Sequence, residues 1–467
     1  MNKNLLLKKY ILFDFIAALL VWIIFFVYRK YVNDIRIFEE GALLFPLSYY
    51  LISFSLFPFC SLFIHYLTGF YVNPFTQSRI SSILTTLSAA AIISVSVFLF
   101  LRITDASISL PYFYGSLFVL FQLIFWVTLF FRAVIFTQIR NNFKTKKWTI
   151  NTLIIGTGKN ARKIAQDLEK HAPQHTLLGF VSVNEKSGTT SKSILGDLSQ
   201  IEYILTQYSI QETIIVLEDK HGDEKLYEII NLLYRFDIAI QFAPRLHEIL
   251  TGSAKISHVG IIPMVTITKN AMPDWESNIK RFTDILLSII ALILLSPLML
   301  YCLLRIKKES EGSPFYKQER IGRFGKPFNI IKFRTMVQNA ENGIPQLSSA
   351  NDARITPFGS FLRKYRIDEF PQFWNVIKGD MSLVGPRPER LHFINQIIEQ
   401  APYYCLLYKI RPGITSWGPI KIGYSDSIEK MIERLNYDII YLDNMSLVTD
   451  LKILIYTVEI ILTGKGV

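Results

Sequence analysis

The chain has 467 residues, of which 50 % are hydrophobic and 14 % aromatic. Its length exceeds what one hydrophobic core usually organises, and its composition excludes a disordered protein and indicates a membrane protein. The formal net charge is +12, but no DNA- or RNA-binding pattern accompanies it, so we expect anionic lipids and phosphorylated substrates as partners and no nucleic acid. The three cysteines form no CxxC pair and predict neither a disulfide framework nor a zinc site.

Four apolar segments fill residues 1–140, and each is long enough to cross a bilayer as a helix. They are Ile11–Tyr28, Ala42–Leu67, Ile80–Leu101 and Tyr112–Phe136. Lysines precede the first segment, and a basic loop with Arg140 and Lys144 follows the fourth. Because positive charge marks the cytoplasmic side, the sequence predicts a four-helix membrane bundle with both ends in the cytoplasm.

Residues 148–260 alternate between strand and helix patterns, which predicts a Rossmann-like α/β domain in the cytoplasm. The strand Ile150–Ile155 runs into Gly156, Gly158 and Ala161, spaced as G-x-G-x-x-A, a candidate nucleotide loop. Dinucleotide-binding domains usually place an acidic residue after the second strand to bind the ribose. Here Asn184 and Glu185 follow that strand, so the identity of this ligand stays open. Without a Tyr-x-x-x-Lys pair in this domain, short-chain dehydrogenase chemistry is disfavoured, and nucleotide binding itself stays open.

Within the segment 278–308, Ile285–Leu304 is apolar for a full membrane thickness, yet two features argue against a fifth span. Ser296 and Pro297 interrupt it, and proline kinks a helix. Both flanks are basic, which puts both ends on the cytoplasmic side. We therefore expect a re-entrant hairpin that breaks at Ser296-Pro297 and returns to the same face, with a kinked transmembrane helix as the alternative.

Residues 309–467 contain the residues suited to chemistry. Asp368 and Glu369 are adjacent carboxylates ahead of Pro371, and such a pair can supply a nucleophile and a hard oxygen ligand for Mg²⁺. Basic residues that could hold a diphosphate surround them in sequence. They are Arg320, the strand residues Lys332 and Arg334, Arg363, and Arg387 within the rigid turn Pro386-Arg387-Pro388.

The segments Lys317–Met336, Arg366–Arg390 and Arg411–Ile420 resemble the bacterial sugar-transferase domain of the polyprenyl-phosphate hexose-1-phosphate transferase family. The resemblance covers about Lys280–Val467, and the order of its motifs is highly specific. A four-helix bundle followed by a Rossmann-like unit is similar to the large members of the family, which start surface-polysaccharide synthesis. One departure is Arg366, where the family usually has a small polar residue.

The resemblance implies a two-step reaction at the cytoplasmic face of the bacterial inner membrane. Asp368 is the implied nucleophile and Glu369 the implied Mg²⁺ ligand. Asp368 attacks the sugar-linked phosphorus of a UDP-sugar and UMP leaves; undecaprenyl phosphate then takes the sugar phosphate from the aspartate. The re-entrant hairpin and the mixed α/β catalytic domain are likewise features that the resemblance implies.

Two other functions stay open at this point. The α/β unit and its glycine loop suit an NAD-dependent nucleotide-sugar dehydratase or epimerase, which requires NAD(P) binding. A non-catalytic scaffold that senses a ligand would release no UMP from any donor. The transferred sugar, the polysaccharide pathway and the oligomeric state are also open, although a helical bundle beside an α/β unit is compatible with a homodimer.

Overall fold

The structure, a computed structural model, describes residues 3–31, 38–39, 42–43, 47–72, 78–104, 110–172, 174–183, 194–217, 223–234, 236, 238–242, 256–259, 262–267, 272–337, 352–423 and 427–463. Asn184 and Glu185 lie outside these residues. The chain divides into two compact units. One comprises Met1–Thr149 with Pro273–Ile279, and the other comprises Ile150–Met272 with Lys280–Val467.

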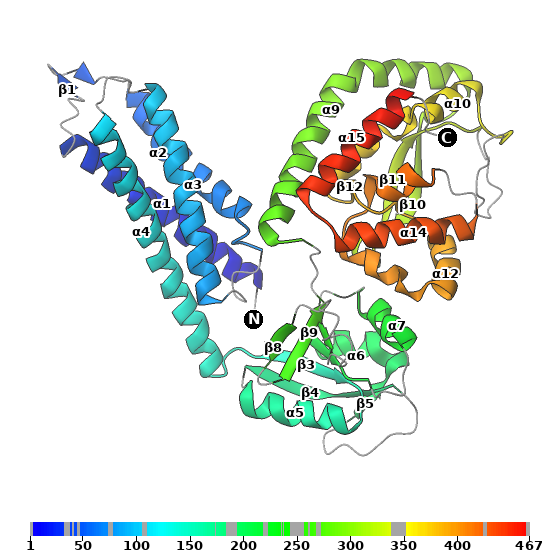
Figure 1. Cartoon of the computed structure of the whole chain (residues 1–467), viewed down its shortest axis with the longest axis horizontal. Helices are drawn as coiled ribbons and strands as arrows, with labels where there is room; N and C mark the ends of the chain where they lie inside the picture. The colour runs from blue at the N-terminus through cyan, green and yellow to red at the C-terminus, as the bar shows by residue number, and fades with distance from the viewer. Residues whose placement is uncertain are drawn as a thin grey trace. The chain divides into compact units, whose positions relative to one another are not determined.

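The first unit contains the predicted apolar helices. They are α1 (Lys3–Tyr31), α2 (Leu47–Leu67), α3 (Arg79–Thr104) and α4 (Leu110–Lys144), and a short pair of strands, β1 (Phe38–Glu39) and β2 (Ala42–Leu43), lies between the first two (Figure 1). Many apolar side chains face outward, such as Ile80 at 71 % and Phe130 at 64 % exposure. Outward apolar side chains on long apolar helices are typical of a lipid-facing surface, so the chain is a membrane protein.

A buried ion pair joins α1, α3 and α4 inside this unit. Arg132 of α4 donates to the Asp14 carboxylate of α1 at 2.7 and 3.2 Å, and its third nitrogen donates to the Thr86 hydroxyl of α3 at 2.7 Å. Tyr71 donates to Asp14 at 2.8 Å, and the Phe70 ring lies 3.4 Å from the Arg132 guanidinium carbon. Since each charge compensates the other in an apolar interior, losing either one leaves an unpaired buried charge.

We therefore expect Asp14→Asn to destabilise the bundle by about 3–5 kcal/mol, because Arg132 stays buried without its counter-charge. The measurement is the fraction of full-length protein that remains monodisperse after heating in detergent. The double variant D14N/R132M should lose less than D14N alone, and Thr137→Ala, on an exposed part of α4, serves as the control. An unchanged midpoint for D14N would contradict the assigned role of the pair.

The second unit begins with a seven-stranded sheet in the order β5-β4-β3-β6-β7-β9-β8. The strands β3 (Ile150–Ile155), β4 (His175–Ser182), β5 (Ile194–Asp197), β6 (Glu212–Ile215) and β7 (Ala239–Phe242) are parallel. The strands β8 (Ile256–Val259) and β9 (Ile262–Ile267) are antiparallel additions at one edge. The parallel α/β sheet confirms the predicted α/β class; the sequence did not reveal β5, a four-residue edge strand.

Helices α5 (Lys159–His171), α6 (Ile201–Gln207) and α7 (Asp223–Tyr234) connect these strands, with the short turn η1 (Leu198–Gln200) before α6. Gly156 lies where β3 ends, at the point where the strand order reverses between β3 and β6. Its φ is +128°, and a Cβ there would lie 2.1 Å from the Val216 carbonyl oxygen, so close packing of the neighbouring strand end already requires glycine. Gly158 caps α5, and Ala161 is fully buried.

The remaining part of the second unit is built around two small sheets. β10 (Phe315–Ile321) pairs antiparallel with β11 (Pro327–Phe333), with the turn η2 (Arg323–Gly325) between them, and β12 (Ser382–Val384) pairs parallel with β13 (Gly413–Thr415). The helices are α10 (Pro357–Lys364), η3 (Ile367–Glu369), α11 (Gln372–Lys378), α12 (Leu391–Gln400), η4 (Pro402–Lys409), α13 (Trp417–Lys421), α14 (Ile428–Asp443) and α15 (Leu447–Thr463).

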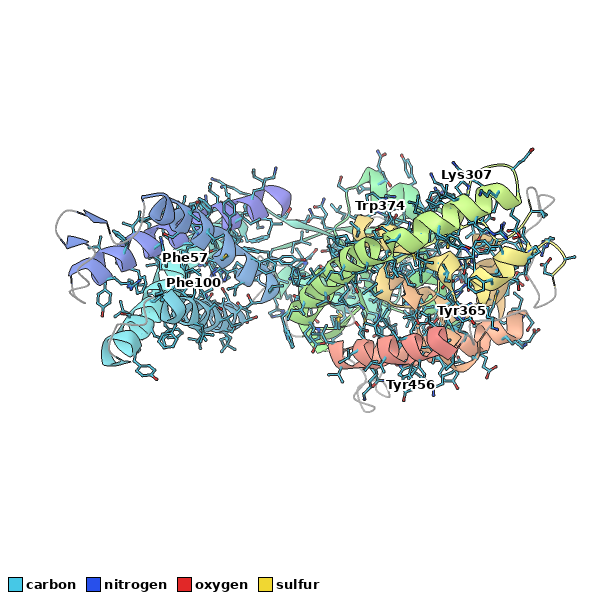
Figure 2. All side chains as sticks on the ribbon, turned by 90° about the horizontal axis from the view of Figure 1, so that it is seen from above. Phe57, Phe100, Lys307, Tyr365, Trp374 and Tyr456 are labelled. Atoms are coloured by element: carbon cyan, nitrogen blue, oxygen red, sulfur yellow. The ribbon has the colours of Figure 1, made fainter. Side chains whose placement is uncertain are left out.

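The apolar segment around Pro297 forms one 36-residue helix, α9 (Asp274–Glu309), with Pro297 inside it. The helix is therefore continuous where the sequence predicted a break. At that position, the Ser296 hydroxyl donates to the Ile293 carbonyl at 2.8 Å. Figure 1 shows that α9 bends partway along its length, and bends of this kind usually occur at proline. Its middle is strongly exposed, with Leu294 at 73 %. Figure 2 shows the side chains of α9 and α15, with Lys307 and Tyr456 labelled.

Both ends of α9 are bound to the rest of the second unit. Near its start, Lys280 donates to Asp450 of α15 at 2.6 Å, and Asp284 accepts the Ser382 hydroxyl of β12 at 2.7 Å. At its far end, Arg334 donates to the carbonyl oxygens of Ser310 and Glu311 at 2.8 and 2.6 Å. The same folded part of the chain therefore binds α9 near its start and just beyond its end.

Candidate active site

Asp368 and Glu369 lie in the short turn η3, directly before α11. Arg366 ends the preceding turn with a left-handed backbone, φ 51°, and Pro371 caps α11. The two carboxylates therefore precede a helix that begins after a proline. Asp368 is 9 % and Glu369 7 % exposed, so both carboxylates are largely removed from water and need compensating charge.

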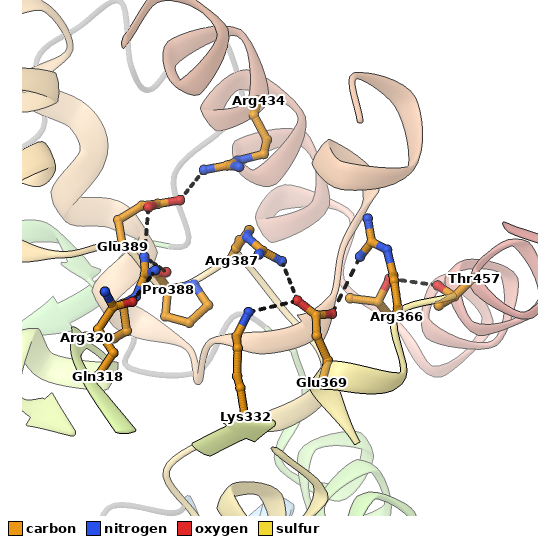
Figure 3. A network of polar contacts seen from close by, with 11 residues as sticks. Gln318, Arg320, Lys332, Arg366, Glu369, Arg387, Pro388, Glu389, Arg434 and Thr457 are labelled. Carbon is orange, nitrogen blue, oxygen red and sulfur yellow. Dashed lines mark hydrogen bonds and ion pairs between the residues drawn. The ribbon is translucent and has the colours of Figure 1, made fainter. Parts of the chain in front are cut away.

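Three cations from three elements surround the Glu369 carboxylate (Figure 3). Lys332 of β11 lies 3.0 Å and Arg387 lies 3.3 Å from its Oε1, and Arg366 lies 3.7 Å from its Oε2. Within the described part of the chain, the Asp368 carboxylate has no comparable ion pair. The two neighbouring carboxylates thus have different surroundings: Glu369 is bound by three cations, whereas Asp368 forms no ion pair with the described residues.

The electrostatics of the two groups differ accordingly. Burial raises the pKa of Asp368 above its ordinary value, and the nearby Glu369 charge adds to the rise, although Lys332 opposes it. Burial acts on Glu369 as well, but Lys332, Arg387 and Arg366 outweigh it and hold the pKa of Glu369 below its ordinary value. Glu369 is therefore a fixed anion, while the charge of Asp368 is less stabilised by its surroundings.

Asn375 of α11 fixes the distance between Lys332 and the dyad. Its side-chain amide donates to the Asn329 carbonyl at 2.7 Å and accepts the Ile331 N–H at 3.0 Å. Asn375 therefore binds the backbone of β11 on both sides of Ile330. Asn375 is 1 % exposed. Because η3 and α11 are contiguous, this joint places β11 and Lys332 against Glu369.

Residues 386–388 form the other wall of the site. The Pro386 carbonyl accepts the Gly413 N–H at 2.9 Å, and the Pro388 carbonyl accepts Arg320 Nη1 at 3.1 Å. The two prolines restrict the backbone on either side of Arg387. Its guanidinium consequently faces Glu369, with Nη1 3.3 Å from Oε1.

The other predicted cations have different surroundings. Arg363 of α10 donates to the Thr335 hydroxyl at 2.9 Å and lies close enough to Asp368 to lower its pKa. Arg320 is bound to Glu389 and to the Pro388 carbonyl. Arg334 binds backbone carbonyls at the end of α9 and is not among the residues that contact the dyad. Gly156, Gly158 and Ala161 belong to the large sheet and its first helix.

Sequence reasoning missed three residues of this network. Arg366 stood out only as a departure from the family pattern, and it supplies the third cation at Glu369. Glu389 directly follows Pro388 and could have been suspected from that position. Arg434 of α14, which binds Glu389, lies 45 residues further along the chain, and no local signal identifies it.

Asn375→Ala is expected to lower stability by about 1–3 kcal/mol, because it leaves a buried backbone donor and acceptor of β11 without partners. The fitting measurement is the thermal midpoint of the full-length protein in nanodiscs. Asn329→Ala offers a matched control, since the Asn329 side chain is exposed on the same strand. Equal midpoints for the two variants would contradict the proposed joint.

A sequence profile described as "bacterial sugar transferase" matches residues 275–464. A UDP-glucose:undecaprenyl-phosphate glucose-1-phosphate transferase of Caulobacter vibrioides is 38 % identical over 186 residues, which cover 39 % of this chain and 70 % of the relative. The region that the profile matches contains the dyad, its cations and all but the first residue of α9. The chain belongs to the bacterial sugar transferase family.

Longer relatives are similar over more of the chain. A UDP-N-acetylgalactosamine-undecaprenyl-phosphate N-acetylgalactosaminephosphotransferase of Aeromonas hydrophila is 38 % identical, with 54 % of this chain and 59 % of the relative covered. A UDP-glucose:undecaprenyl-phosphate glucose-1-phosphate transferase of Escherichia coli (strain K12) is 30 % identical, with 60 % of this chain and 62 % of the relative covered. In both cases the match spans less than two thirds of the relative's length.

Proposed function

We propose that this chain transfers a sugar 1-phosphate from a UDP-sugar to undecaprenyl phosphate and releases UMP. One observation carries the proposal: the buried Asp368 carboxylate, which forms no ion pair with the described residues, adjoins a carboxylate held by three cations. The named relatives, which differ in the sugar, act on UDP-sugars and undecaprenyl phosphate. These relatives share the donor nucleotide and the lipid acceptor, which supports the same substrate class for this chain. The identity of the sugar has to be found by experiment.

In the proposed first step, an Asp368 oxygen attacks the sugar-linked phosphorus of the donor. The phosphorus–oxygen bond to UMP breaks, and UMP leaves with the electron pair. In the second step, an oxygen of undecaprenyl phosphate attacks the same phosphorus, and the bond to Asp368 breaks. An acyl phosphate is reactive enough for this second transfer, which is why a carboxylate suits the role.

The cations at Glu369 would stabilise the charge that develops on the donor diphosphate during the first step. Lys332 and Arg387 lie on the same Glu369 oxygen, so a diphosphate that arrives beside Asp368 meets two donors already in place. Preorganised donors of this kind lower the barrier because they need no rearrangement at the moment of reaction. The same donors would bind the phosphates of departing UMP.

The residues of the dyad also fit Mg²⁺. The described residues contain no cluster of three or more acidic, histidine or cysteine side chains, but Mg²⁺ commonly uses one or two carboxylates together with substrate phosphates and water. We propose Glu369 as its protein ligand, with the donor diphosphate completing the set. When bound, Mg²⁺ would offset charge on the diphosphate and on the leaving UMP.

We further propose that α9 is re-entrant and that the α/β part is Rossmann-like. Lys280 and Asp284 near one end of α9, and Ser310 just beyond the other, bind the same folded part. Both ends of α9 would therefore lie on one face of the membrane, with its exposed apolar middle in one leaflet. The cytoplasmic face of the bacterial inner membrane is the proposed location, since UDP-sugars are made in the cytoplasm.

Asp368→Asn should reduce UMP release by about a thousandfold or more, because an amide cannot form the acyl phosphate. The assay measures UMP from a panel of UDP-sugars with Mg²⁺ and undecaprenyl phosphate, and the same panel identifies the sugar. Asp443→Asn, at an exposed position of α14, should keep activity within about twofold. Normal turnover by D368N would rule out Asp368 as the nucleophile.

The topology of α9 can be tested by cysteine labelling in a Cys60→Ser background, since the other two cysteines are buried. Ser277→Cys and Lys308→Cys should both react with an impermeant maleimide in inside-out vesicles and stay unlabelled in right-side-out vesicles. Leu294→Cys should resist labelling in both, because the middle of α9 would lie in lipid. Labelling of the two ends from opposite sides would establish a transmembrane helix instead.

A further inference from the structure

The Glu389 carboxylate is buried between two arginines from distant parts of the chain (Figure 3). Its Oε2 accepts Arg320 Nη1 of β10 at 3.1 Å, and its Oε1 accepts Arg434 Nη2 of α14. The side chains of Glu389 and Arg434 are each 7 % exposed. The Glu389 carboxylate thus compensates the positive charge of two guanidiniums. These two arginines are separate from the cations that bind Glu369.

The backbone carbonyls of residues 386, 388 and 389 are each bound. Gly413 N–H donates to the Pro386 carbonyl at 2.9 Å, Arg320 Nη1 donates to the Pro388 carbonyl at 3.1 Å, and Ile321 N–H donates to the Glu389 carbonyl at 3.0 Å. The Arg387 side chain, which these contacts leave pointing at Glu369, is therefore carried by a backbone that is fixed on both sides.

Arg434, the second partner of the Glu389 carboxylate, comes from helix α14. Gly418 of α13 packs directly on the Arg434 side chain, where a Cβ would lie 2.1 Å from the Arg434 Cγ. The glycine is thus required for close approach, and any larger residue there would displace Arg434 from Glu389 without removing a charge.

We propose that Glu389, held by Arg320 and Arg434, is a positioning residue that fixes Arg387 for the donor diphosphate. This inference rests on the proposed function. It changes the role expected for Arg320, because Arg320 acts through Glu389 and the Pro388 carbonyl and not as a direct phosphate ligand. It also assigns a role to Arg434 and Gly418, neither of which touches the dyad.

The two half-reactions separate positioning from general structural support. If Glu389 only supports the fold, its loss should lower stability and affect both substrates alike. If it aims Arg387, its loss should weaken the donor complex selectively, because undecaprenyl phosphate arrives after UMP has left. The ratio of the KM values for the two substrates is therefore the informative quantity.

The experiment uses the full-length enzyme in nanodiscs with its best UDP-sugar donor. Glu389→Gln keeps the side-chain shape but removes the charge that both arginines need, so we expect the donor KM to rise about tenfold while the acceptor KM stays within about twofold. Glu389→Asp, which keeps the charge, should recover part of the loss. Gly418→Ala should also raise the donor KM, because the added methyl group displaces Arg434 from Glu389.

Glu433→Gln, at an exposed position next to Arg434, is the matched control and should leave both KM values unchanged. Equilibrium dialysis with UDP, which carries the diphosphate without the sugar, gives a readout that does not need turnover, and Glu389→Gln should weaken UDP binding about tenfold. If Glu389→Gln fails to fold, Gly418→Ala and Arg434→Lys provide the same comparison.

The outcomes distinguish this inference from the proposed function. Unchanged donor KM and UDP binding in Glu389→Gln and Gly418→Ala, in an enzyme whose wild type releases UMP, would overturn the positioning role alone. Equal changes in both KM values together with a lower thermal midpoint would also overturn it. A wild type that binds no UDP and releases no UMP with any donor would overturn both.

Discussion

Helix α9 is attached near its start and just beyond its end to the same folded part of the chain. Lys280 joins the helix to α15, and Arg334, directly after β11, binds the residues that follow the helix. The apolar middle of α9 is exposed between these attachments, with Leu294 at 73 % exposure. The dyad belongs to the same part of the chain, so these attachments fix the helix relative to the two carboxylates.

A second constraint is the division of basic residues between two buried glutamates. Glu369 binds Lys332, Arg387 and Arg366, and Glu389 binds Arg320 and Arg434. Unpaired cations this close to one another would repel, and each would be costly to bury. The pairing with two carboxylates keeps five cations near one site, beside Asp368.

The first unit uses the same principle in an apolar setting. Asp14 and Arg132 compensate each other between helices whose outer surfaces are apolar. In the parallel sheet of the second unit, close packing determines the residue type. A side chain at position 156 would clash with the Val216 carbonyl at the end of the neighbouring strand, so only glycine fits there. The glycine pattern at that loop therefore has a packing explanation, and nucleotide binding there stays a prediction.

The sequence alone determined the four apolar helices, the α/β class and the cluster of a carboxylate pair with Lys332 and Arg387, because these follow from local periodicity, turn chemistry and adjacent residues. It did not reveal that Arg334 binds the carbonyls after α9, and it missed Arg434, which meets Glu389 across 45 residues of chain. Only the tertiary structure decided which cation binds which carboxylate and that both ends of α9 bind the same part. Such pairings depend on contacts between elements far apart in sequence, where no local pattern specifies the partner.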